Sequence, residues 1–141
     1  MTNAVYPTYK GFILTAAANI SLDQNDTTNG PYCALVDTGT YTYSAAHDFY
    51  NDLSGIAGTD QRISTPTVAA GTGLFDGDDL TYTAVVAGAS IEALVVYRKN
   101  SGANTTWKLV FFEDTSVTGL PVTPNGGNIT ITWNASGILQ I

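Results

Sequence analysis

Charged side chains are scarce in this sequence. Of its 141 residues 12% are charged, about half the share usual for a soluble domain. Five Lys and Arg stand against twelve Asp and Glu, which gives a formal net charge of −7, and the basic residues form no cluster. Because phosphate backbones repel such a chain, we expect no nucleic-acid partner. A surface with so little charge is instead suited to burial against partner subunits.

Cysteine and long apolar runs are also rare. Cys33 is the single cysteine, which excludes an internal disulfide and a cysteine-rich metal site, and we predict that it is a buried apolar side chain rather than a reactive thiol. The uncharged run from Phe12 to Leu22 is too short and too polar to cross a bilayer, and no basic export signal precedes it. We therefore expect no membrane partner.

The carboxyl-terminal half has the pattern of β-strands. "LTYTAV" places Leu80, Tyr82 and Ala84 on one face, and "NITITWN" alternates in the same way, as half-buried antiparallel strands do. "IEALVVYR" and "TWKLVFFED" are apolar on both faces, which is typical of central strands, and the turn "KNSGANT" predicts that they form a hairpin. "LPVTPNGGN" predicts another tight turn, and "GILQI" a last strand.

One short amphipathic helix is predicted in "SAAHDFYNDLSG", residues 44–55. Its apolar residues follow the i, i+3, i+4, i+7 spacing of a helix, with Ser44 as the N-cap and Gly55 at the end. The segment before residue 32 is less regular, although "KGFILTAAANI" fits either a strand or a short helix. We therefore predict a mainly β chain, a single-domain antiparallel β-sandwich that is jelly-roll-like and spans residues 1–141. Residues 1–31 are expected to be an irregular docking arm, and Trp107, Phe111, Ile129, Ile131 and Trp133 to share the core.

The sequence "ALVDTG" resembles the active-site strand of an aspartic protease. In those enzymes two such loops face each other, so that two carboxylates share a proton and activate a water. Here Gly39 is followed by Thr-Tyr-Thr-Tyr, and the later apolar-apolar-Gly segment of the proteases is missing. We therefore interpret Asp37-Thr38-Gly39 as a turn in which Asp37 bonds nearby backbone amides and Gly39 has a positive φ.

Other chemistry-bearing residues give weaker patterns. His47 is the only histidine, and we interpret His47-Asp48 as a solvated pair on the predicted helix. Asp76 to Asp79, "DGDD", lacks the alternating ligands and final Glu of a calcium loop, so a solvated acidic turn is favoured over a weak calcium site. We expect no catalytic, cofactor-binding or metal-binding residues, and no enzyme activity.

Three blocks of the sequence resemble a family of tailed-bacteriophage virion proteins. They are "ALVDTGTYTYSAAHDFYNDL", "LTYTAVVAGASIEALVVYRKNSG" and "GLPVTPNGGNITITWN", which cover roughly residues 33–134 in the order and spacing of that family. The chain departs from the family at the amino end, where "AANISLDQNDTTNG" replaces a helical, Trp-bearing segment.

The resemblance implies a structural protein of the virion, made in the host cytoplasm. Its size favours a capsid decoration, or cement, protein that binds the major capsid protein on the outer surface of the head and bridges capsomers as a homotrimer. A tail or head–tail connector module, or a receptor-binding β-domain, is the alternative. Copy number on the virion separates the two, since decoration needs on the order of hundreds of copies and a connector about a dozen.

Overall fold

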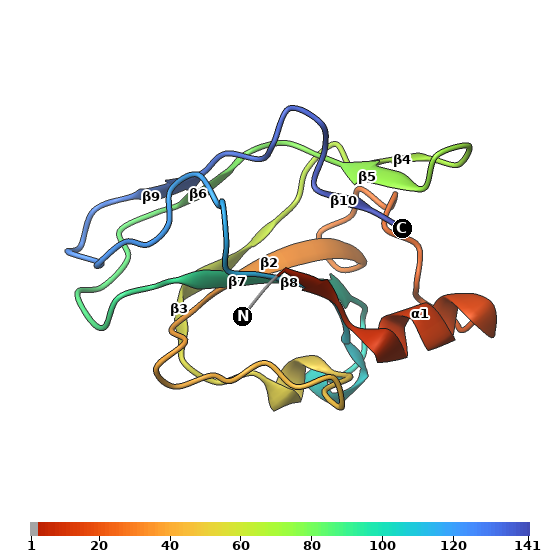
Figure 1. The fold of residues 1–141 in the computed structure, drawn as a ribbon, viewed down its shortest axis with the longest axis horizontal. Helices are drawn as coiled ribbons and strands as arrows, with labels where there is room; N and C mark the ends of the chain where they lie inside the picture. Colours follow the sequence, from red (N-terminus) through yellow and green to blue (C-terminus); the bar gives the residue numbers. More distant parts are fainter. Residues whose placement is uncertain (1–2) are drawn as a thin grey trace.

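The computed structural model describes residues 3–141 and is mainly β, with antiparallel sheets (Figure 1). Its elements follow the order β1 (Ala4–Val5), α1 (Pro7–Leu14), β2 (Gly30–Val36), η1 (Tyr50–Asp52), β3 (Ile56–Arg62), β4 (Thr67–Ala69), β5 (Leu74–Asp76), β6 (Leu80–Tyr82), β7 (Ala93–Lys99), η2 (Asn104–Thr106), β8 (Lys108–Glu113), β9 (Ile129–Ile131) and β10 (Leu139–Gln140), where η marks a 3₁₀-helix. No helix among residues 3–141 has the length and apolar content needed to span a bilayer.

A five-stranded antiparallel sheet, in the order β1-β8-β7-β2-β3, forms the centre of the molecule. The predicted hairpin is confirmed as β7 and β8. Strands β2, β7 and β8 are almost wholly buried, because the short sheets β10-β5-β4 and β6-β9 cover one face while the segment between β2 and β3, together with η2, lies over the other (Figure 1). A sheet covered on both faces accounts for strands that are apolar on both sides.

The layers meet in one hydrophobic core. Leu80, Tyr82, Ile129 and Ile131 of the β6-β9 pair are buried, and the Tyr82 hydroxyl donates a hydrogen bond of 2.8 Å to the backbone oxygen of Cys33 in β2. The antiparallel, sandwich-like arrangement was therefore predicted correctly, as were the buried Cys33 and the last strand, which is β10.

The predicted helix at residues 44–55 is wrong. Only the single 3₁₀ turn η1 forms there. Tertiary contacts outweigh the helical spacing, because Phe49 pairs with Lys108 at the start of β8 and the Tyr50 amide donates to the Trp107 backbone oxygen over 2.8 Å.

Among residues 3–141 the α-helix is α1, which begins with Pro7 at its first position. At that position the fixed φ of proline favours a helix, and its missing N–H is no loss. The expectation of an irregular arm over residues 1–31 is therefore wrong for the part that contains β1 and α1. The arm packs on the core through the buried side chains Tyr6, Tyr9 and Leu22. Met1 and Thr2 lie outside the described residues.

Three further details of the sequence-based prediction need correction. Trp107 is only half-buried at the edge of the core, whereas Phe111, Ile129, Ile131 and Trp133 are buried as predicted. The strand predicted over residues 80–85 ends at Tyr82, because Ala84 is exposed and has a φ of 49°. Gly39 does not have the positive φ that was predicted for it. In the segment between β2 and β3 the glycine with a positive φ is Gly55, at 62°.

Candidate functional site

The Asp-Thr-Gly segment, residues 37–39, is a turn at the end of β2. The two carboxylate oxygens of Asp37 are used within the turn: Oδ1 accepts a 2.7 Å hydrogen bond from the Gly39 amide and Oδ2 accepts a 3.0 Å bond from the Thr40 hydroxyl. The backbone oxygen of Asp37 accepts from the amides of Thr40 and Tyr41. The predicted bonding of Asp37 to a nearby amide is thus confirmed, and it fixes the carboxylate in a structural position.

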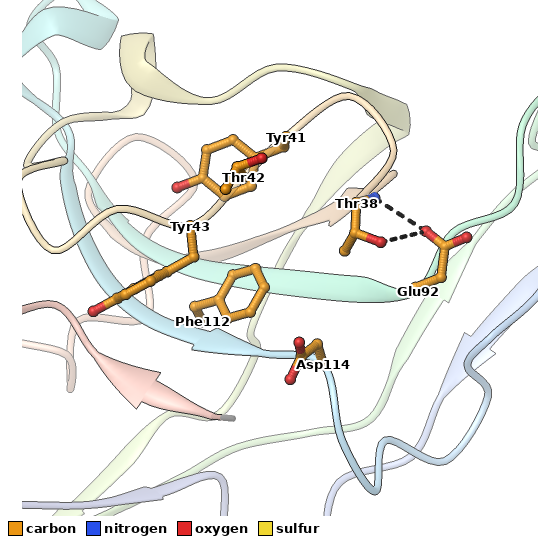
Figure 2. Close-up of a pocket in the computed structure, with 7 residues that line it drawn as sticks. All are labelled: Thr38, Tyr41, Thr42, Tyr43, Glu92, Phe112 and Asp114. Carbon is orange, nitrogen blue, oxygen red and sulfur yellow. Dashed lines mark hydrogen bonds between the residues drawn. The ribbon is translucent and has the colours of Figure 1, made fainter. Parts of the chain in front are cut away.

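An open hollow of about 240 Å³ lies beside this turn. Glu92 is held at its rim, since one carboxylate oxygen accepts from the Thr38 amide over 3.0 Å and from the Thr38 hydroxyl over 3.2 Å (Figure 2). Tyr43 and Phe112 form the wall next to Asp114, and their rings lie 5.3 Å apart. Asp37 does not line this hollow, whose carboxylates are Glu92 and Asp114. It lines a neighbouring depression instead, and the described lining of that depression holds no second carboxylate.

His47 belongs to a chain of hydrogen bonds and not to a helix. Its Nδ1 atom lies 2.9 Å from the Tyr41 hydroxyl, which lies 2.8 Å from the hydroxyl of the buried Tyr6. Burial and the bond to Tyr41 raise the pKa of Tyr6 well above its ordinary value. The interpretation of His47-Asp48 as a solvated pair on a helix is therefore wrong, because both residues are half-buried and His47 ties the segment after β2 to the amino-terminal arm.

The acidic turn after β5 is also engaged in structure. Asp79 accepts a 2.9 Å hydrogen bond from the Trp133 amide, and the backbone oxygen of Asp78 accepts one of the same length from the Trp133 indole. Within residues 3–141 no group of three or more His, Cys, Asp or Glu side chains is placed to hold a metal ion. The lone thiol is fully buried, which raises the pKa of Cys33 to about 12 and keeps it in the unreactive protonated form.

A groove of about 430 Å³, which we call the apolar groove, is lined mainly by apolar side chains. One wall comes from the amino-terminal arm and the other from the β4-β5-β10 sheet with the carboxyl terminus. Three of its side chains are substantially exposed: Ile13 at 39%, Val68 at 45% and Ile141 at 55%. The groove is lined by Tyr9, Ile13, Ile20, Ser21, Leu22, Asp23, Val68, Gly73, Phe75, Leu139 and Ile141.

The arm is fixed in position by buried polar contacts. The Tyr9 hydroxyl donates to the Ile20 oxygen over 2.6 Å. The Arg98 side chain, 1% exposed in β7, donates to the backbone oxygen of Ser21 and to the side-chain oxygen of Gln24. The loop after α1 is thereby tied to the central sheet, so the wall it forms is built in advance of any binding partner.

No pattern in the sequence signals this groove directly. Its walls come from residues 9–23, 68–75 and 139–141, which only the fold brings together. The apolar end of the chain and the uncharged "FILTAAANI" were visible in the sequence, but nothing in either pattern shows that they face each other across a depression.

Comparisons with protein-family models, with curated proteins and with solved structures found no match for this chain.

Proposed function

We propose that this protein is a structural component of a tailed-bacteriophage virion, a decoration protein that binds the outer surface of the head. The apolar groove is the observation that carries the docking role, and the three sequence blocks that resemble phage virion proteins support the setting. The proposal gives the protein no catalytic role and no cofactor.

The groove has the properties of a docking surface. Exposed apolar side chains gathered around one depression are characteristic of interaction sites, whereas isolated ones are common on any surface. Ile13, Val68 and Ile141 gather in this way, and Asp23 is the one charged residue of its described lining. We propose that apolar side chains on the outer surface of the major capsid protein occupy the groove, because a contact core depleted of charge is what stable interfaces contain.

Net charge supports a position outside the shell. At −7 the chain would be repelled by packaged DNA, and its five basic residues are spread among Lys10, Arg62, Arg98, Lys99 and Lys108. We propose a homotrimer at the points where three capsomers meet, since a closed threefold ring makes three equivalent contacts and turns weak single contacts into tight attachment.

The groove can be tested with a pair of matched variants. Val68 in β4 and Val86, which is 81% exposed and lies outside the groove, are both exposed valines. Purified Val68→Asp and Val86→Asp proteins are added to heads that lack the protein, and the bound fraction is measured by co-sedimentation. We expect Val68→Asp to lose binding at least tenfold (about 1.4 kcal/mol) and Val86→Asp to bind as the unchanged protein does.

Thermal melts of both variants show whether each is folded. Equal binding by the two folded variants would exclude the groove as the docking surface. Binding of the unchanged protein only to tails or to the portal vertex would replace decoration with the tail or connector role.

A further inference from the structure

A further depression, which we call the aromatic basin, lies on the face of the central sheet opposite the β6-β9 pair (Figure 1). It has a volume of about 350 Å³ and is open to solvent. Its residues come from β2, β3, β7 and η1, together with Trp107, the residue that follows η2, and none of them lines the apolar groove. The basin is lined by Tyr32, Tyr50, Ile56, Gly58, Thr59, Asp60, Tyr97, Lys99 and Trp107.

The aromatic rings of the basin form one connected set. Tyr97 stands between two neighbours, with the Tyr32 ring 5.9 Å away and the Trp107 ring 5.8 Å away, both stacked, while Tyr50 packs edge-on against Trp107 at 5.2 Å. The Trp107 indole N–H donates to the backbone oxygens of Asn100 and Gly102. The indole is therefore fixed in orientation before any ligand arrives.

Asp60 supplies an acceptor inside this set of rings. Its Oδ2 atom accepts hydrogen bonds from the hydroxyls of Tyr50 at 2.7 Å and Tyr97 at 2.9 Å. Within residues 3–141 no hydrogen bond reaches the other oxygen, Oδ1. Burial raises the pKa of Asp60, while the two tyrosine hydroxyls and the nearby positive charge of Lys99 act in the opposite direction. A carboxylate held this way presents one oxygen with its lone pairs available.

Lys99 supplies the matching donor. Its ammonium lies 4.7 Å from the centre of the Tyr32 ring and 5.1 Å from that of Trp107. In the described part of the chain, residues 3–141, this ammonium donates no hydrogen bond and forms no ion pair with Asp60. The basin thus places an unused three-proton donor and an unused carboxylate oxygen on the same aromatic surface.

We propose that the aromatic basin binds a neutral oligosaccharide. Of two adjacent hydroxyls on a pyranose ring, one donates to Asp60 Oδ1 and the other accepts from the Lys99 ammonium. The C–H face of the sugar packs on the half-buried rings of Tyr32, Tyr50 and Trp107, since Tyr97 beneath them is only 2% exposed. Aromatic faces carry partial negative charge and C–H groups carry partial positive charge, so the two attract. This function goes beyond capsid binding and uses a different surface.

Other ligand classes fit the basin less well. A second cation would meet the Lys99 ammonium already placed over the rings. An acidic sugar or a nucleotide would face Asp60 and a net charge of −7. A zwitterion such as a free amino acid could pair with both charges, but it would leave most of an open basin of about 350 Å³ unfilled.

The binding experiment uses the full chain on an array of neutral, sialylated and uronate oligosaccharides. The best neutral binder is then titrated by calorimetry against the unchanged protein, Lys99→Met and Asp60→Asn. In Asp60→Asn the tyrosine hydroxyls hold the amide oxygen in the Oδ2 position, which turns the NH₂ group into the basin where a sugar hydroxyl needs an acceptor. We expect each variant to raise Kd about tenfold or more.

A matched control exists elsewhere on the surface. The Lys108 ammonium lies 5.1 Å from the centre of the Phe12 ring, the same kind of contact outside the basin, so Lys108→Met should leave Kd within about twofold. No binding by any neutral oligosaccharide overturns the proposal. So do preferential binding of acidic sugars, equal effects of Lys99→Met and Lys108→Met, or displacement of the sugar by free amino acids at the same concentration.

Discussion

The two tryptophans should differ in what they contribute to stability. Trp133 is 9% exposed, and its indole donates to the Asp78 oxygen over 2.9 Å while its amide donates to the Asp79 carboxylate. Burying a tryptophan removes roughly 150–250 Å² from water, which at about 25 cal/mol per Å² corresponds to about 4–6 kcal/mol as an upper bound. With the cavity left behind, Trp133→Ala should cost about 3–5 kcal/mol. A typical domain has only about 5–15 kcal/mol to lose.

Trp107 is half-buried at the edge of the core, so Trp107→Ala should cost roughly half as much, about 2 kcal/mol. Urea denaturation followed by circular dichroism measures both variants on one scale. In thermal melts of a chain of this size, 1 kcal/mol shifts Tm by roughly 3 °C, so the two variants should differ clearly. A loss for Trp107→Ala equal to or greater than that for Trp133→Ala would show that the burial assigned to the two indoles is wrong.

Three further predictions concern polar groups. Arg98→Lys should lower the free energy of unfolding by about 2–3 kcal/mol, because a lysine in β7 cannot reach both Ser21 and Gln24. Limited proteolysis should then cut the loop after α1, and an uncut loop would contradict this. Burial raises the pKa of Asp60 above 3.8, so the folded state binds its proton more tightly than the unfolded state does. The free energy of unfolding should therefore fall as pH rises from about 3.8 through the folded pKa, and Asp60→Asn should remove this fall in urea denaturation. Parallel pH profiles of stability for the variant and the unchanged protein would contradict this. Asp37→Asn should change stability by less than about 1 kcal/mol and leave particle binding intact, whereas a pepstatin-sensitive peptidase activity abolished by the change would restore the protease interpretation.

The strands were predictable where a local pattern and the tertiary environment agree. The hairpin β7-β8 carries unbroken apolar runs on both sides of a Gly/Asn turn, and the sheet is covered on both faces. The Asp-Thr-Gly turn was predictable for the same reason, since Asp37 bonds within its own turn.

The helix was mispredicted because tertiary contacts override a short local period. The apolar residues of segment 44–55 fit a helix, yet the Tyr50 hydroxyl bonds to Asp60 and its ring packs on Tyr97 and Trp107, which holds the segment in an extended path with one 3₁₀ turn. Pro7 was a usable start signal for α1 that the hydrophobic spacing alone does not show.

The apolar groove and the aromatic basin could not be predicted from the sequence. The apolar groove joins segments from the two ends of the chain, from Tyr9 to Ile141. The aromatic basin joins Asp60 to Tyr97 and Lys99 across strands that are neighbours of β2 on opposite sides. Single-sequence patterns report which face of an element is apolar, but they do not report which elements stand side by side.

Docking on the outside of a phage head is tested most directly by the copy number of the chain per particle. A stained gel of purified virions, calibrated against the band of the major capsid protein, gives this ratio. Decoration predicts on the order of hundreds of copies, in a fixed ratio to the capsid subunits. About a dozen copies per particle, or labelled antibody confined to the tail or portal vertex, would contradict decoration and favour a connector or tail module.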